Sequence, residues 1–259
     1  MNIDLKLYYD KYSSHYSSAS QLARVVTESW FKDNMYCPFC AKESVKDFPN
    51  NHPITDFYCD ECNEEFQLKS KRGHLGKVIT DGEYNKMMGA VNANNTPNFL
   101  FLNYESDFHF INDLLMIPKE FILPNCIQKR KPLSSAAKRA GWTGCNIHLD
   151  RISENGKLYL VRNKRVMSIE EVTNKVTSIG FIRQNKNVAS RGWINDILLV
   201  ISSIQKSMFT LNDVYKYEKF LKELHPENNH VKDKIRQQLQ ILRDNSIIEF
   251  LGKGVYRKL

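Results

Sequence analysis

The sequence predicts a mixed α/β domain followed by a smaller, mainly helical domain. Apolar runs typical of buried strands alternate with helical periodicity over the first 185 residues, and two close pairs of cysteines lie among them. After that point helical segments lead into a short hairpin pattern at the end of the chain. A chain of 259 residues is long enough for two domains, so we place residues 1–185 in one and residues 186–259 in the other.

The first domain begins with a helix and two strands. Residues 19 to 31 repeat apolar side chains at helical spacing, which predicts an amphipathic helix. Residues 54 to 58 and 65 to 69 read as strands. The second of these alternates polar and apolar residues, so Gln67 and Lys69 are expected on one face of it.

The other elements of this domain follow in order. They are a helix at 83–92, a central strand at 98–104, a strand at 114–117, a basic irregular segment at 126–145, a strand at 157–161 and a helix near 168–179.

The C-terminal segment predicts a winged helix, with helices at 190–205, 210–224 and 230–244 and a hairpin around Gly252 to Gly254. Trp193, on the first of these helices, is expected in the core. In a helix-turn-helix arrangement the second helix of the motif, here residues 230–244, enters the major groove. The residues expected to contact DNA are Lys232, Arg236, Gln240 and Arg243 on the polar face of the last helix, and Lys253 and Arg257 on the wing.

The charge balance also favours a polyanionic partner. The chain has 37 Lys and Arg against 29 Asp and Glu, a net charge of +8. Lys138 and Arg139 belong to a basic patch beside Trp142, which is the candidate for apolar contact with a base; a core position is the alternative for this tryptophan. No apolar stretch approaches a membrane span and no secretory signal is apparent, so we expect a cytoplasmic protein, monomeric in solution.

The four paired cysteines predict a structural zinc site. Cys37 and Cys40 are followed after 18 residues by Cys59 and Cys62, a spacing typical of four thiolates around one tetrahedral Zn²⁺. With four thiolates bound, no position remains for a reactive water, so the metal has a structural role. A redox dithiol needs only one such pair and leaves the other unexplained.

A candidate motif for phosphodiester hydrolysis begins between the two cysteine pairs. It consists of Asp56 and, after ten further residues, Gln67-Leu68-Lys69. This spacing places an acid and an amine where two strands meet. Hydrolysis of a phosphodiester needs a divalent metal, acidic ligands and a group that positions water. This spacing taken alone is a weak signal.

In context these residues resemble the PD-(D/E)XK nucleases, and more closely the DpnI-type methyl-directed restriction endonucleases. The resemblance extends over the whole chain. The segments that carry it are Tyr36 to Cys40, Asp56 through Lys71, Arg139 to Trp142, Gly144 to Asn146, Ser190 to Trp193 and Lys234 to Asp244.

The resemblance implies a PD-(D/E)XK restriction-endonuclease-like mixed sheet with a four-cysteine zinc insertion at about 37–62, plus a C-terminal winged-helix domain. It implies a type II enzyme that uses Mg²⁺ to cleave double-stranded DNA at GATC carrying N6-methyladenine. Asp56 corresponds to the metal-binding acid and Lys69 to the catalytic lysine. Gln67 stands where the family has Glu, and its amide oxygen can still ligate Mg²⁺ but carries no charge.

The sequence leaves three explanations for Gln67 open: a natural variant with tolerable activity, an inactivating substitution, or compensation by Glu65 on the same strand face. Two other classes of protein also remain. One is a methyl-DNA-binding protein without cleavage activity, built on the same fold. The other is a zinc-ribbon factor, which explains the cysteines and the charge but not Asp56, Lys69 and the winged helix together.

Overall fold

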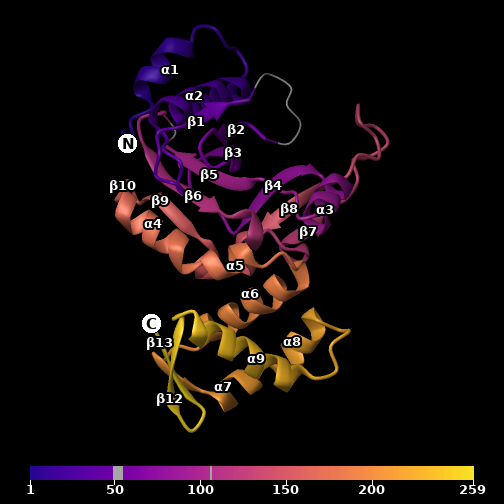
Figure 1. The fold of residues 1–259 in the computed structure, drawn as a ribbon. Coiled ribbons are helices and arrows are strands. Elements are labelled where there is room, and N and C mark those ends of the chain that lie inside the picture. The colour runs from indigo at the N-terminus through magenta and orange to yellow at the C-terminus, as the bar shows by residue number, and fades with distance from the viewer. Residues whose placement is uncertain (49–54, 106) are drawn as a thin grey trace. The chain divides into compact units, whose positions relative to one another are not determined.

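The structure is a computed structural model that describes residues 1–48, 55–105 and 107–259 (Figure 1). It contains two compact units, each assembled from separate stretches of the chain. One comprises Met1–Lys77, Asn95–Lys119 and Lys157–Thr177, and the other comprises Val78–Asn94, Glu120–Gly156 and Ser178–Leu259. Ile54, expected in a strand, lies outside the described residues. Within the described part of the chain, no helix combines the length and hydropathy needed to cross a bilayer.

A seven-stranded mixed sheet forms the centre of the first unit, in the order β1-β2-β3-β5-β6-β9-β10. All neighbouring strands are antiparallel except β3 and β5, which are parallel. The strands are β1 (Val45–Asp47), β2 (Phe57–Cys59), β3 (Glu65–Arg72), β5 (Asn98–Tyr104), β6 (Ile111–Ile117), β9 (Leu158–Arg162) and β10 (Arg165–Val166).

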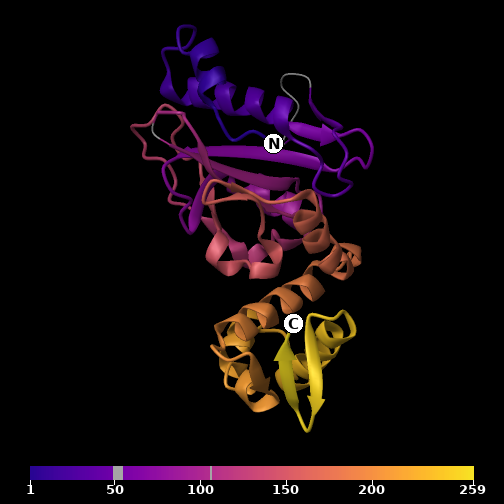
Figure 2. The ribbon, with the colours of Figure 1, turned by 90° about the vertical axis from the view of Figure 1, so that its left-hand side faces the viewer.

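Helices cover both faces of this sheet. The helices of the first unit are α1 (Lys6–Tyr12), α2 (Ala19–Asn34) and α4 (Ile169–Ser178). Figures 1 and 2 show α2 across one face and α4 across the other. β5 is covered on both sides, and all seven of its residues are buried. Five of them are apolar, and the side-chain amides of the other two, Asn98 and Asn103, donate hydrogen bonds. The predicted helix at 19–31 and central strand at 98–104 are confirmed.

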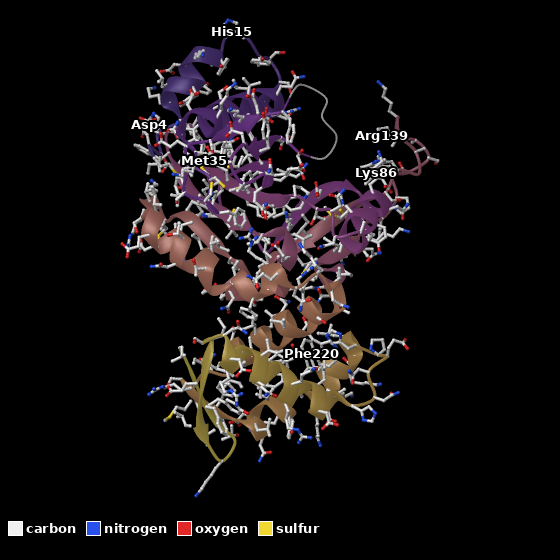
Figure 3. The ribbon with its side chains drawn as sticks, in the orientation of Figure 1. Asp4, His15, Met35, Lys86, Arg139 and Phe220 are labelled. Atoms are coloured by element: carbon white, nitrogen blue, oxygen red, sulfur yellow. The ribbon has the colours of Figure 1, made fainter. Side chains whose placement is uncertain are left out.

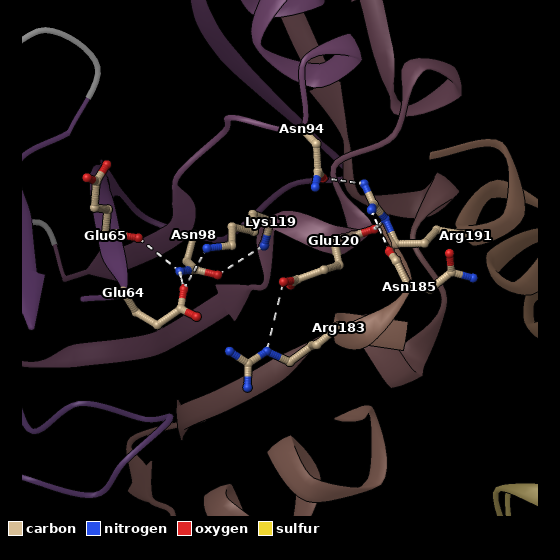
Figure 4. Close-up of polar contacts among 9 residues, drawn as sticks. All are labelled: Glu64, Glu65, Asn94, Asn98, Lys119, Glu120, Arg183, Asn185 and Arg191. Atoms are coloured by element: carbon tan, nitrogen blue, oxygen red, sulfur yellow. Dashed lines mark hydrogen bonds and ion pairs between the residues drawn. The ribbon is translucent and has the colours of Figure 1, made fainter. Parts of the chain in front are cut away.

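A polar network connects β3, β5 and β6, three adjacent strands in the middle of this sheet, at one end of the strands (Figure 4). The buried Asn98 amide donates to a Glu64 carboxylate oxygen at 2.9 Å and to the Glu65 carbonyl at 2.9 Å. Lys119, just beyond β6, forms an ion pair with Glu64 at 3.0 Å. The network therefore fixes where β3 begins relative to β5 and to the end of β6.

The second unit contains a three-stranded sheet in the order β4-β8-β7 and the helix α3 (Tyr84–Asn92). The strands are β4 (Val78–Glu83), β7 (Ile127–Lys129) and β8 (Gly144–His148). This sheet was not expected from the sequence: no strand was predicted at β4, and the prediction that all of 126–145 is irregular is wrong. The three strands are short, and they pair only with partners far away in the chain.

This unit continues through three short 3-10 helices into two longer connecting helices. These are 3-10 helices Pro124–Cys126, Leu149–Arg151 and Glu154–Gly156, then α5 (Gly180–Gln184) and α6 (Val188–Ser203). A further 3-10 helix spans Lys119–Phe121. Trp193 on α6 is 5% exposed, so its predicted core position is confirmed.

Arg191 on α6 is the largest charged side chain in this core, with 2% of its surface exposed (Figure 4). Its guanidinium donates to the carbonyls of Glu120 at 3.0 Å and Asn185 at 2.8 Å, and to the side chain of Asn94 at 2.8 Å. A buried cation is tolerated only where its donors are satisfied. Arg191 therefore joins four segments of the second unit.

Replacing Arg191 with Met is expected to lower the free energy of unfolding by about 3 kcal/mol. The substitution keeps apolar volume but leaves buried acceptors without a donor. Urea denaturation followed by circular dichroism measures the change. Lys138→Met, at an exposed position of the same unit, is the control and should leave the denaturation midpoint unchanged.

The C-terminal part of the second unit is a winged helix, as predicted. Its elements are β11 (Met208–Thr210), α7 (Leu211–Tyr215), α8 (Glu218–Leu224), α9 (Val231–Asp244), β12 (Ile248–Gly252) and β13 (Val255–Lys258). The single helix expected at 210–224 is wrong. Thr210 pairs with β13 and starts α7 through a capping box with Asp213. The helix is then interrupted at Tyr217, whose φ of −95° and ψ of 8° are not helical, before α8 begins.

The wing is a tight hairpin between β12 and β13. Lys253 and Gly254 occupy its two central positions with φ of 50° and 73°. Positive φ at both central residues is what a type I′ turn requires, and this turn matches the twist of the flanking strands. The hairpin predicted around Gly252 to Gly254 is confirmed, and it presents Lys253 at its tip.

Candidate active site and DNA-binding surface

The four paired cysteines converge as the spacing predicted. Their sulfur atoms all lie within 4.8 Å of one another, with 3.5 Å between Cys37 and Cys62 and 3.6 Å between Cys40 and Cys59. Four thiolates at the usual Zn–S length of about 2.3 Å around a tetrahedral ion have sulfurs about 3.8 Å apart. The residues therefore fit Zn²⁺ with little rearrangement.

Each cysteine pair is held in the same kind of knuckle turn. The residue after the second cysteine of each pair has a left-handed backbone, Ala41 with φ of 59° and Asn63 with φ of 58°. The amides of these residues donate back to the carbonyls of Cys37 and Cys59, at 2.8 and 2.9 Å. The turns point both sulfurs of each pair to the same side, which is the arrangement that one shared ion needs.

The surroundings treat the four thiols differently. Burial raises the pKa of Cys37, and burial also raises the pKa of Cys62 to about 11. At Cys59 burial acts in the same direction, but a hydrogen bond with the Ser44 hydroxyl and backbone amides outweighs it and lowers the pKa to about 7. Zn²⁺ binding must therefore displace protons from Cys37 and Cys62 at neutral pH.

The motif Asp56, Gln67 and Lys69 is also brought together. Asp56 directly precedes β2, and its backbone amide donates to the Phe66 carbonyl at 3.0 Å. One Asp56 carboxylate oxygen accepts from the Leu68 amide at 2.9 Å. Continuing the register Phe57 opposite Phe66 by one residue sets Asp56 opposite Gln67, on one face of the sheet.

On β3 the burial pattern separates the two faces as predicted. Phe66 and Leu68 are buried, whereas Gln67 and Lys69 are half-buried on the other face. Glu65, offered above as a substitute for the missing carboxylate, lies exposed at the beginning of the strand, opposite Tyr58. Asp56 therefore adjoins Gln67 and Lys69 at the middle of β3.

A polar cleft of about 450 Å³ opens beside Asp56. One side is a face of α2, where Arg24, Glu28 and Lys32 follow one another at single-turn spacing. Arg24 pairs with Glu28 at 2.7 Å, and Lys32 pairs with Asp47 at 2.8 Å. Burial, together with the negative charge of Asp56, raises the pKa of Glu28, although Arg24 opposes this shift.

Trp142 lies in the loop that joins β7 to β8, which bears Lys138 and Arg139 (Figure 3). The Arg139 guanidinium stacks over the indole at 4.7 Å from the ring centre. The ring also packs so closely on Gly144 that a Cβ at this glycine would come within 2.9 Å of it. Trp142 is therefore half-buried. This exposure is less than that of a side chain free to insert into DNA and more than that of a core tryptophan.

The winged helix presents the predicted polar face of α9. Val231, Ile235, Leu239 and Leu242 are buried, whereas the four residues expected to contact DNA on this helix are exposed. Three of those four pair with acids of the same domain: Arg236 with Asp233, Arg243 with Asp244 at 2.7 Å, and Lys232 with Glu218 at 3.4 Å. On the wing, Arg257 pairs with Glu249. DNA phosphates binding here compete with these carboxylates.

Two family models match the chain, one after the other. The model of the Dam-replacing family, DpnI, matches residues 3–185, and the model of the Dam-replacing helix-turn-helix domain matches residues 189–258. The chain belongs to the DpnI family. Members are methylation-dependent restriction enzymes with a helix-turn-helix domain, so membership makes this chain a DNA-binding protein of a nuclease family.

In this DpnI-family chain Glu28 and Arg24 also line the cleft beside Asp56, and neither was expected there from the sequence. Their i, i+4 spacing is visible in the sequence, but such pairs are common on the solvated faces of helices. Among the residues that the structure describes, close groups of three or more His, Cys, Asp or Glu side chains are the zinc cysteines and Glu105, Asp107 and His109. Asp56 belongs to neither group. Mg²⁺ at Asp56 would therefore need oxygen ligands besides those of a preformed cluster of three acidic side chains.

Proposed function

We propose that the protein is a Mg²⁺-dependent type II endonuclease that cleaves double-stranded DNA at GATC containing N6-methyladenine. The observation that carries the proposal is the Asp56 carboxylate, fixed by the Leu68 amide next to Gln67 and Lys69. Membership of a family of methylation-dependent restriction enzymes supports it.

In this proposal Asp56 and Gln67 supply oxygen atoms to the metal. Bound Mg²⁺ would contribute positive charge next to the scissile phosphate. Lys69 follows Gln67 on the same strand face, where its ammonium group can orient the attacking water and offset the charge that develops on the phosphate oxygens. The Leu68 amide keeps the Asp56 carboxylate oriented before substrate arrives.

Trp142 is the candidate for contact with the N6-methyl group, because its indole offers an apolar face beside hydrogen-bonding groups. Arg139 stacks on the ring and, with Lys138, offers cations to nearby phosphates. The winged helix supplies a second contact, with Arg236, Gln240 and Arg243 directed to base edges or phosphates, and Lys232, Lys253 and Arg257 to phosphates.

One observation favours a second candidate, a methyl-DNA-binding protein without cleavage activity. Gln67 removes one negative charge from the metal ligands, and Mg²⁺ binds carboxylate more favourably than amide oxygen. The same surfaces would then bind methylated DNA without hydrolysing it.

Digestion of GATC duplexes separates the two functions. Fully methylated, hemimethylated and unmethylated duplexes are incubated with the protein and Mg²⁺, with Asp56→Ala as the control. Cleavage confined to methylated duplexes, and lost in the control, supports the nuclease. Selective binding of methylated duplex by a protein that leaves it intact at every Mg²⁺ concentration supports the second candidate.

The winged helix gives a further prediction. Arg236→Ala and Arg243→Ala should each weaken DNA binding by about 1 to 3 kcal/mol if the side chain contacts a base edge. An arginine that contacts phosphate should instead reduce the salt dependence of binding without changing sequence preference. Fluorescence anisotropy at several salt concentrations distinguishes these cases. Unaltered binding by both variants would place the recognition surface elsewhere.

A further inference from the structure

The metal site at Asp56 lacks negative charge if Gln67 is its other protein ligand. Proteins usually bind Mg²⁺ through one or two carboxylates, completed by water and by the phosphates of the substrate. Asp56 with Gln67 contributes a single negative charge, toward a substrate that is itself a polyanion. A second carboxylate from elsewhere in the fold would make up the difference.

Glu28 lies where such a carboxylate is needed. It faces the cleft that Asp56 also lines, and its side chain is 29% exposed. The opposite face of α2 is fixed in the core by the buried residues Val26 and Trp30. The position of Glu28 at the cleft therefore follows from the packing of the helix.

The other acids near the cleft are committed elsewhere. Asp47 pairs with Lys32 and is 53% exposed, and Asp33 accepts a hydrogen bond from the Tyr8 hydroxyl at 3.1 Å. Glu64 does not line the cleft and belongs to the network with Asn98 and Lys119 (Figure 4). Glu28 and Asp56 line the same cleft, and two negative charges there repel each other unless a cation lies nearby.

We infer that Glu28 is the second carboxylate of the divalent-metal site and supplies the charge that Gln67 lacks. Arg24, one turn earlier on α2, neutralises this carboxylate in the metal-free protein through their 2.7 Å ion pair. Arg24 is 70% exposed, so it can move away when a metal ion takes over the carboxylate. The inference rests on the proposed function, because it concerns the metal of the same site.

Mn²⁺ binding tests the inference without relying on cleavage. The zinc-loaded protein is titrated with Mn²⁺, and free Mn²⁺ is measured by electron paramagnetic resonance. Glu28→Gln is expected to weaken binding at least tenfold, and Asp56→Asn at least as much. Asp33→Asn, which removes the same charge from the same helix and cleft, is the matched control and should change the affinity less than twofold.

A rescue variant separates metal binding from a structural role. Adding Gln67→Glu to Glu28→Gln should restore Mn²⁺ affinity to within about threefold of the original protein, because a carboxylate returns to the site. Failure of this rescue, or unchanged Mn²⁺ affinity in Glu28→Gln when Asp56→Asn binds weakly, would overturn the role of Glu28 and leave the proposed nuclease intact. Unchanged affinity in Asp56→Asn would instead remove the metal site on which the proposed function depends.

Discussion

Removal of zinc is expected to unfold the edge of the main sheet and abolish cleavage. Binding of structural Zn²⁺ to cysteine sites is worth about 10 kcal/mol or more, comparable to the whole stability of a domain. Cys59 ends β2, and the knuckle of Cys59 and Cys62 leads into β3, so both strands that hold the nuclease motif depend on the metal.

Metal analysis should find one tightly bound Zn²⁺ per chain, and a strong chelator should lower the thermal unfolding midpoint markedly. Cys62→Ser should lose the zinc, whereas Cys145→Ala, at a buried cysteine outside the cluster, should retain it. A zinc-free protein with an unchanged unfolding midpoint would contradict this role.

At the metal site, Asp56→Ala is expected to reduce cleavage by at least about 1000-fold, which corresponds to about 4 kcal/mol of barrier. Asp56 is held against β3 by the Leu68 amide, and alanine removes the only carboxylate that the motif offers beside Gln67 and Lys69. Gln67→Glu should act in the opposite direction and raise cleavage at least about tenfold, because an added anionic ligand tightens Mg²⁺ binding.

Single-turnover cleavage of methylated GATC across a Mg²⁺ titration measures both effects. DNA binding without metal should change little in Gln67→Glu, or weaken slightly, since a new anion then faces phosphate. Equal rates for Gln67→Glu and the original protein at every Mg²⁺ concentration would show that position 67 does not hold the metal.

The sequence predicted the elements whose pattern is local and strong. The apolar run of β5 and the amphipathic pattern of α9 predicted these elements correctly, because the spacing of the buried positions is visible within each segment. The alternation in β3 also placed Gln67 and Lys69 on one face. The cysteine spacing predicted the cluster because a shared ion restricts which turns can carry its ligands.

Contacts between distant segments could not be predicted in this way. β4 has one buried residue, Ile79, and pairs only with β8, so neither hydrophobicity nor neighbouring residues mark it as a strand. Glu28 reached the candidate site because α2 packs beside β3, a tertiary contact that leaves no mark in either segment. The break before α7 was readable, since Thr210 and Asp213 have the spacing of a capping box.

The pairing of β4 with β8 has a consequence for how the chain folds during synthesis. β4 leaves the ribosome well before its partner β8, which follows about 60 residues later. Translation of these intervening residues takes roughly 3 to 12 seconds. During that interval β4 has no strand to complete its hydrogen bonds, whereas β1, β2 and β3 can already assemble around zinc. Nascent chains halted before Gly144 should therefore retain metal and yet remain open to proteases at Val78–Glu83.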